Sequence, residues 1–188
     1  TFLLLCMLSP PLVAQEVLRI LTWPGYADSD LTSAFEDRYD VAVEVTYVGS
    51  DDELQQQLAA PGNHFDVVAA NTSEIQQLTR QQLLQPLRLN KLSNRGRQLT
   101  QFRQLQNIPG LVTDNQAYGV PYTFSEMGLI YNRKLLSTPP DSLSSLWDAQ
   151  FKGQVLAYDG SSHNVSLTRM ALGKAPFAID PAELPETI

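Results

Sequence analysis

Short apolar runs alternate with helical patterns along the first half of the chain, and this alternation constrains the fold most. The apolar runs are Val17–Trp23, Val41–Val48 and Phe65–Ala70, and turn signals or helix caps follow them. Between the runs, residues 29–39 and 50–60 carry apolar side chains at helical spacing. Strands joined by helices of this length pair in parallel, so we predict an α/β lobe whose parallel sheet has helices on both faces.

Local signals place the helix boundaries. Ser50 and Glu53 have the spacing of a capping box, which predicts a helix start at Ser50, and Pro61 ends that helix. A further helix is predicted over Ser73–Gln82. The polar segment 87–114 shows weak periodicity and predicts short helices and loops at the surface.

The sequence after Tyr122 predicts a smaller second lobe. Its 66 residues are few for an independent α/β core, so we expect the chain to be cut at its C-terminus. We predict a first lobe over residues 16–122 and a partial second lobe over residues 123–188. The second lobe is expected to contain strands over Met127–Tyr131 and Val155–Tyr158 and helices over Ser144–Asp148 and Ser166–Gly173.

The N-terminal segment predicts export. Residues 1–14 are uncharged and almost wholly apolar, too few to span a bilayer as a helix, and they end in small residues before Gln15. This pattern is typical of the apolar core and cleavage region of a signal peptide, so we interpret residues 1–15 as its remnant and expect a periplasmic protein. The alternatives are a buried N-terminal strand or a membrane-anchor stub. Leu5 before Cys6 disfavours a lipoprotein site.

Composition limits the partners. No cysteine follows Cys6, so the exported chain must be stabilised by its core and not by disulfides. The net charge of −7 argues against nucleic acid and anionic membrane surfaces as partners. It is compatible with a cationic ligand.

Four local patterns point to a known family. They are the loop 23–26 after the first strand, the strand and loop 66–73, the crossing 121–132, and Trp147 followed by residues 151–153. In order and spacing they resemble the bacterial periplasmic solute-binding proteins of ABC importers, and within them the spermidine/putrescine-binding branch. The resemblance runs from about Val17 to Leu172. It implies a periplasmic binding protein type II-like fold, with two α/β lobes, a hinge, and ligand buried between the lobes.

The resemblance implies a ligand site at the carboxyl ends of the strands, where open α/β sheets bind ligands. Trp23 and Tyr26 would hold an ammonium group or an apolar stem, at about 0.5–2 kcal/mol for each aromatic contact. Asn71 and Ser73 would supply neutral hydrogen-bonding groups. Each residue has a structural alternative: packing for the two aromatic side chains, and helix capping for Asn71 and Ser73.

Two acidic residues complete the predicted site. Glu126 lies near the expected hinge, where it either lines the cleft or is solvated. Asp159 follows the predicted strand of the second lobe, and its alternative is a turn residue before Gly160. The polyamine branch has two carboxylates here, whereas this chain has Asp159 and a neutral residue, Asn164 or Ser166. The ligand is therefore expected to be a small polar solute, either polyamine-like or carrying fewer charges.

Catalysis is not expected. Asp159, Ser161 and His163 are residue types used in nucleophilic catalysis, but groups this close in one loop rarely form a working triad. The sequence has no nucleophile elbow, no phosphate-binding glycine loop and no metal-ligand cluster, so we expect no cofactor. We predict a periplasmic binding protein that delivers its solute to an inner-membrane ABC permease. The alternative is the extracytoplasmic sensing domain of a membrane signalling protein.

Overall fold

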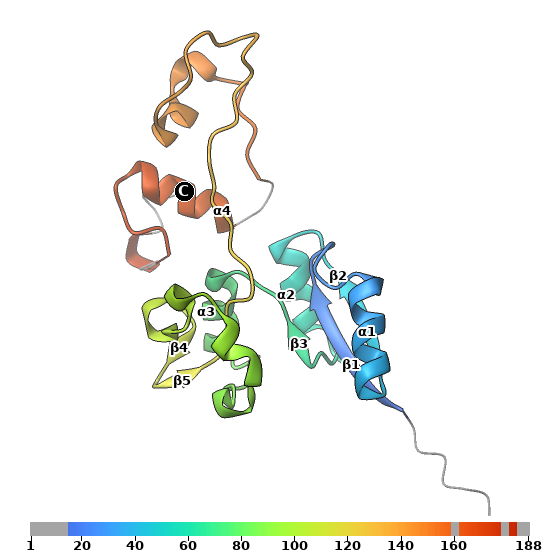
Figure 1. The fold of residues 1–188 in the computed structure, drawn as a ribbon. Helices are drawn as coiled ribbons and strands as arrows, with labels where there is room; N and C mark the ends of the chain where they lie inside the picture. The colour runs from blue at the N-terminus through green and yellow to red at the C-terminus, as the bar shows by residue number, and fades with distance from the viewer. Residues whose placement is uncertain (1–14, 159–161, 178–180, 184–188) are drawn as a thin grey trace, which may run out of the picture.

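The computed structural model of the chain describes residues 15–158, 162–177 and 181–183 (Figure 1). The predicted signal-peptide remnant, apart from Gln15, and the predicted ligand residue Asp159 lie outside the described residues.

A three-stranded parallel sheet forms the centre of the first lobe. β1 (Glu16–Thr22) lies between β2 (Val41–Tyr47) and β3 (Val67–Val68), and both neighbours run parallel to it. The β1–β2 register is continuous over the length of both strands, from Glu16 opposite Val41 to Thr22 opposite Tyr47. The predicted parallel sheet is therefore confirmed. β3 is shorter than expected, although the amide of Ala69 still donates to the carbonyl of Leu21 at 2.9 Å.

Three helices connect and follow these strands: α1 (Ser29–Tyr39), α2 (Asp51–Ala59) and α3 (Thr72–Arg80). The chain moves from β1 to β2 on one side and then crosses back past β1 to β3. Right-handed crossovers in opposite directions place α1 and α2 on opposite faces of the sheet. Figure 1 shows the two helices on either side of β1.

The first core cluster joins the sheet to α2 and α3. Its fully buried members are Leu21 on β1, Val48 after β2, Leu54 on α2 and Leu78 on α3. Burying a leucine side chain contributes about 1.5–3 kcal/mol, so these side chains hold both helices on the sheet.

The apolar side chains of α1 face solvent. Leu31, Phe35 and Tyr39 are 62%, 41% and 54% exposed, and no residue of this helix is buried. A polar contact joins α1 to the sheet instead, since the amide of Val43 donates to the Glu36 carboxylate at 2.7 Å. Helical periodicity thus located the helix but did not reveal which face contacts the sheet.

A second core cluster forms against the other side of α3. Ile75, Leu105, Leu111 and Ala117 are its buried members. Four 3-10 turns lead into it, as expected for the polar segment; they span Leu89–Lys91, Ser93–Arg97, Thr100–Phe102 and Leu105–Asn107.

An antiparallel hairpin completes this cluster, and the sequence analysis missed it. β4 (Val112–Thr113) pairs with β5 (Gln116–Ala117). Asp114 and Asn115 at the tip have φ of 50° and 60°, as a two-residue type I′ turn requires.

The second lobe departs most from expectation. Met127–Tyr131 and Val155–Tyr158 form no strands, because no other strand in the described residues pairs with them. Their side chains are correspondingly uncovered: Ile130 is fully exposed and Leu156 is 96% exposed. The segment contains 3-10 turns over Leu143–Trp147, Ala149–Phe151 and Pro181–Glu183 and one α-helix, α4 (Ser162–Ala171). α4 begins four residues before the predicted start at Ser166, and the predicted helix over Ser144–Asp148 is a 3-10 turn.

Among the described residues, no helix has the length and apolarity needed to cross a membrane.

Replacing Leu54 should separate core packing from helix propensity. Leu54→Ala leaves a cavity between α2 and the sheet and is expected to lower the free energy of unfolding by about 2–5 kcal/mol. Leu31→Ala is the matched control, because Leu31 is largely exposed on α1 and its loss should change the free energy by less than about 0.5 kcal/mol. Urea denaturation measures both variants. Equal losses would contradict the assignment of the core.

Candidate functional site

The carboxyl ends of the three strands meet at one edge of the sheet. The β1–β3 register places Ile20 opposite Val67 and Leu21 opposite Val68, so Trp23 follows β1 beside the residues that follow β3. On the other side, the amide of Val48 donates to the carbonyl of Thr22 at 3.0 Å and leads the chain into α2. The loop 23–28 and the amino ends of α1, α2 and α3 therefore share this edge, which we call the carboxyl edge.

A tight turn positions the first two predicted ligand residues. The amide of Tyr26 donates to the carbonyl of Trp23 at 3.3 Å, and Gly25 has a φ of +87°. Pro24 and Gly25 thus occupy the central positions of a type II turn, where proline fixes φ and glycine tolerates a positive φ. Trp23 is half-buried against the first core cluster, and Tyr26 is 45% exposed.

Tyr122 joins this pair from the crossing between the lobes, and the sequence analysis missed it as a site residue. Its ring meets that of Tyr26 edge to face, with centroids 5.5 Å apart and planes at 71°. Burial of the hydroxyl, and secondly the nearby Tyr26, raise the pKa of Tyr122 to about 12, against a smaller opposing effect of a hydrogen bond with Thr22. Tyr122 as a whole is 62% exposed, so the burial that raises this pKa is partial.

The two polar residues predicted to bind ligand follow β3. Asn71 is the N-cap of α3, but its half-buried side chain makes no capping hydrogen bond, so capping alone does not account for it. Ser73 donates its hydroxyl to the Glu74 carboxylate at 3.0 and 3.1 Å. Glu74 is 4% exposed and was not singled out from the sequence, because nothing in the pattern of α3 distinguishes a buried glutamate from a solvated one.

The structure does not bring the acidic candidate Glu126 into this group. Glu126 is exposed in the extended segment beyond Tyr122, and no hydrogen bond or ion pair within the described residues involves it. Asp159 lies outside the described residues. Ser162, three residues further along, does contact this edge, because its amide donates to the carboxylate of Asp51 at 3.0 Å.

The carboxyl edge is acidic. Residues 23–30, 48–54 and 69–75 contain no lysine or arginine. Their carboxylates stand at the helix starts and are Asp28, Asp30, Asp51, Asp52, Glu53 and Glu74. A helix amino end by itself attracts anions, but a carboxylate in the first turn neutralises that partial positive charge. The edge is therefore suited to a cationic or neutral polar molecule.

A separate hollow lies in the second lobe. It has a volume of about 270 Å³ and is lined mainly by apolar side chains around Trp147, together with Asp148 and Lys152. A smaller hollow of about 170 Å³ shares Trp147 and reaches α4. Both lie beside the unpaired segment Val155–Tyr158, so they are gaps under uncovered apolar chain and lack the convergent polar groups of a ligand site. In the described part of the chain, no three His, Cys, Asp or Glu side chains are grouped to hold a metal.

The fold is that of an α/β protein, and the carboxyl edge is the place where open α/β sheets bind ligands. The chain belongs to the bacterial extracellular solute-binding protein family, whose model matches residues 30–188. The family resemblance predicted from the sequence is confirmed, as is the export of the chain.

Solved structures with the same fold include two proteins of spermidine/putrescine transport and a lipoprotein of Treponema pallidum. A putative spermidine/putrescine ABC transporter from Listeria monocytogenes is 23% identical, with a TM-score of 0.70 over 92% of this chain and 52% of that one. The spermidine/putrescine substrate-binding protein PotD from Streptococcus pneumoniae, in complex with calcium and HEPES, is 22% identical, with a TM-score of 0.66 over 92% of this chain and 52% of that one. The TpPotD lipoprotein of Treponema pallidum is 20% identical, with a TM-score of 0.62 over 92% of this chain and 53% of that one. The type II-like fold is thereby confirmed, and the chain spans about half the length of these proteins.

The tyrosine pair can be tested by titration. Because the folded-state pKa of Tyr122 is about 12, above the usual 10, the folded protein holds this proton more tightly than the unfolded chain. The protonated Tyr122 hydroxyl therefore contributes to the free energy of unfolding in full below about pH 10, and this contribution is lost as the pH rises toward 12. Tyr122→Phe should remove one late-titrating phenol from the ultraviolet phenolate titration. An unchanged titration between pH 10 and 12 would contradict the burial of the Tyr122 hydroxyl beside Tyr26.

Proposed function

We propose that the chain is the solute-binding component of an ABC importer and binds a small cationic, polyamine-like solute at the carboxyl edge. The first lobe, residues 16–122, supplies this edge, and the second lobe, residues 123–188, covers it. Family membership supports the binding role, and the spermidine/putrescine transport named for two of the solved proteins supports the solute class.

One observation carries the choice of a cation. The carboxyl edge combines exposed aromatic rings with helix starts that bear carboxylates and no basic side chain. Ammonium groups are attracted both to aromatic faces, at about 0.5–2 kcal/mol each, and to the negative edge. An anionic solute would find neither a counter-charge nor an unneutralised helix amino end there.

The roles of the individual residues follow from their positions. Trp23 and Tyr26 hold the solute by their ring faces, and Tyr122 fixes the orientation of Tyr26. Asn71 accepts a hydrogen bond from an ammonium group through its side-chain oxygen, which makes no capping hydrogen bond to α3. Asp159 supplies a carboxylate from the second lobe, and Glu126 lines the approach from the hinge.

The proposed partner and compartment follow from the same role. An exported binding protein of this kind releases its solute to an inner-membrane ABC permease, which places it in the periplasm. No catalytic step is proposed, because binding and release complete the task.

A thermal-shift comparison tests the proposed solute class. A ligand that binds only the folded state raises the melting temperature by mass action. Putrescine and spermidine at millimolar concentration should raise it, whereas citrate and glutamate, as anionic controls, should not. Stabilisation by the anions alone, or by none of the four compounds, would overturn the proposal of a cationic solute.

Replacing Trp23 tests the location of the site. Trp23→Ala should weaken the binding of spermidine or putrescine by about 10- to 100-fold, because about 1–3 kcal/mol of aromatic contact is lost. Trp147→Ala is the matched control, since Trp147 lies in the second lobe beside the apolar hollow. Isothermal calorimetry measures both. A larger loss for Trp147→Ala would place the ligand in that hollow instead.

A further inference from the structure

Among the described residues, two hydrogen bonds connect α4 and the segment after it to the first lobe. The amide of Ser162, the first residue of α4, donates to the Asp51 carboxylate at 3.0 Å. The side-chain amide of Gln76 on α3 donates to the carbonyl of Phe177 at 3.3 Å. The partners are more than 100 residues apart in sequence, so these contacts fix the position of the second lobe.

Asp51 is placed to serve two helices at once. It is 8% exposed and stands in the first turn of α2, where a carboxylate complements the positive end of the helix. Its oxygen also accepts from Ser162, one of the amides at the start of α4 that no carbonyl within the helix can satisfy. One buried carboxylate thus joins the amino ends of α2 and α4.

Capping of α2 does not require Asp51. Ser50 is the N-cap, and its hydroxyl accepts from the amide of Glu53 at 3.2 Å. The Glu53 carboxylate in turn accepts from the amide of Gly49 at 2.8 Å. Asp52 provides a further, exposed charge in the same turn. The distinguishing property of Asp51 is therefore its contact with α4.

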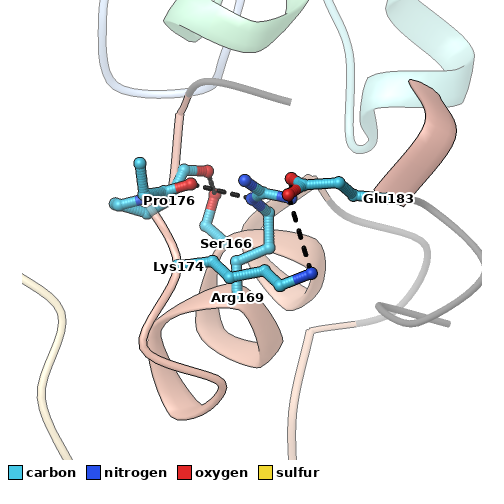
Figure 2. A network of polar contacts seen from close by, with 6 residues as sticks. Ser166, Arg169, Lys174, Pro176 and Glu183 are labelled. Atoms are coloured by element: carbon cyan, nitrogen blue, oxygen red, sulfur yellow. Dashed lines mark hydrogen bonds and ion pairs between the residues drawn. The ribbon is translucent and has the colours of Figure 1, made fainter. Parts of the chain in front are cut away.

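A network of polar contacts joins α4 to the segment that follows it, as Figure 2 shows. Arg169 is 2% exposed and donates to the carbonyl of Ala175 at 2.7 Å and to the Glu183 carboxylate at 2.8 Å. Lys174 lies 3.7 Å from the same carboxylate, and Ser166 donates to the carbonyl of Pro176 at 3.2 Å. The segment that carries Phe177 is thereby tied to the helix that carries Ser162.

The first-lobe partner Gln76 is also held in place. A Cβ atom at Gly110 would stand only 2.2 Å from Cγ of Gln76, so the side chain of Gln76 lies directly on the backbone of Gly110. The absence of a side chain at Gly110 leaves room for the glutamine that reaches Phe177. Each of the two interlobe contacts therefore joins groups that are fixed within their own lobe.

We propose that Asp51 is an interlobe latch, a positioning residue that holds the amino end of α4 against the carboxyl edge. Asp51 belongs to the same edge as Trp23 and Asn71, so the latch sets how closely the second lobe approaches the ligand site. The latch forms between groups of the protein itself. It acts whether or not a solute is bound, and its test needs no ligand.

Hydrogen exchange of the 188-residue chain, measured by mass spectrometry, tests the latch. Asp51→Ala should speed exchange in peptides covering residues 162–171 by about tenfold or more, because α4 loses its anchor. Asp52→Ala is the matched control, since it removes an equal charge from the same turn of α2 but has no part in the latch. It should leave exchange in α4 unchanged. Asp51→Asn, which keeps an accepting oxygen, should restore part of the protection. Equal exchange in α4 for Asp51→Ala and Asp52→Ala would overturn the proposal.

A cross-linking measurement keeps the test decisive if Asp51→Ala also loosens the first lobe. In a Cys6→Ser background that keeps Asp51, cysteines at positions 76 and 177, where α3 contacts the segment after α4, should form an intramolecular disulfide under mild oxidation. Adding Asp51→Ala should slow this disulfide at least tenfold, whereas adding Asp52→Ala should not. Equal rates for the two added substitutions would show that α4 does not rest on Asp51 and would overturn the latch.

Discussion

The parallel pairing of β1 with both of its neighbours is the constraint on which the rest of the structure depends. Parallel strands deliver all their carboxyl ends to one edge, and each is followed by a loop that leads into a helix. Trp23, Asn71 and the amino ends of three helices therefore converge without any direct contact being needed to bring them together. The core under this edge, centred on Leu21, makes the arrangement rigid.

The convergence of helix amino ends concentrates positive partial charge at the carboxyl edge, and the acidic residues there offset it. Three helix amino ends at one place favour anions. Carboxylates in the first turns of the helices reverse that preference, and Asp51 serves both α2 and α4. The same residues thus stabilise the helices, disfavour an anionic solute and hold the second lobe. A substitution at Asp51 acts on more than one of these properties, which is why a neighbouring acid in the same turn is an informative comparison.

The sequence predicts a structural feature when the interactions that determine it join residues close together in the chain. The strands and helices of the first lobe follow from local period and from caps such as Ser50, and their parallel order follows from connection length. The contact of Tyr122 with Tyr26 spans 96 residues and has no local signal. The turn at Asp114 and Asn115 does have a local signal, because Asp and Asn tolerate the positive φ that both residues adopt. The apolar segment Val155–Tyr158 was interpreted as a strand from its composition alone, but a strand also needs a partner.

The two lobes differ in what holds them, and this difference bears on binding. The first lobe is stabilised by two apolar clusters, whereas polar contacts from Asp51 and Gln76 attach α4 and its following segment. Each such hydrogen bond contributes modest net free energy, so apolar packing, and not the contacts with α4, holds the carboxyl edge in shape. The residues proposed to bind the solute, Trp23 and Tyr26, therefore lie on the part of the chain that apolar packing holds, and the proposed latch sets how closely α4 approaches them.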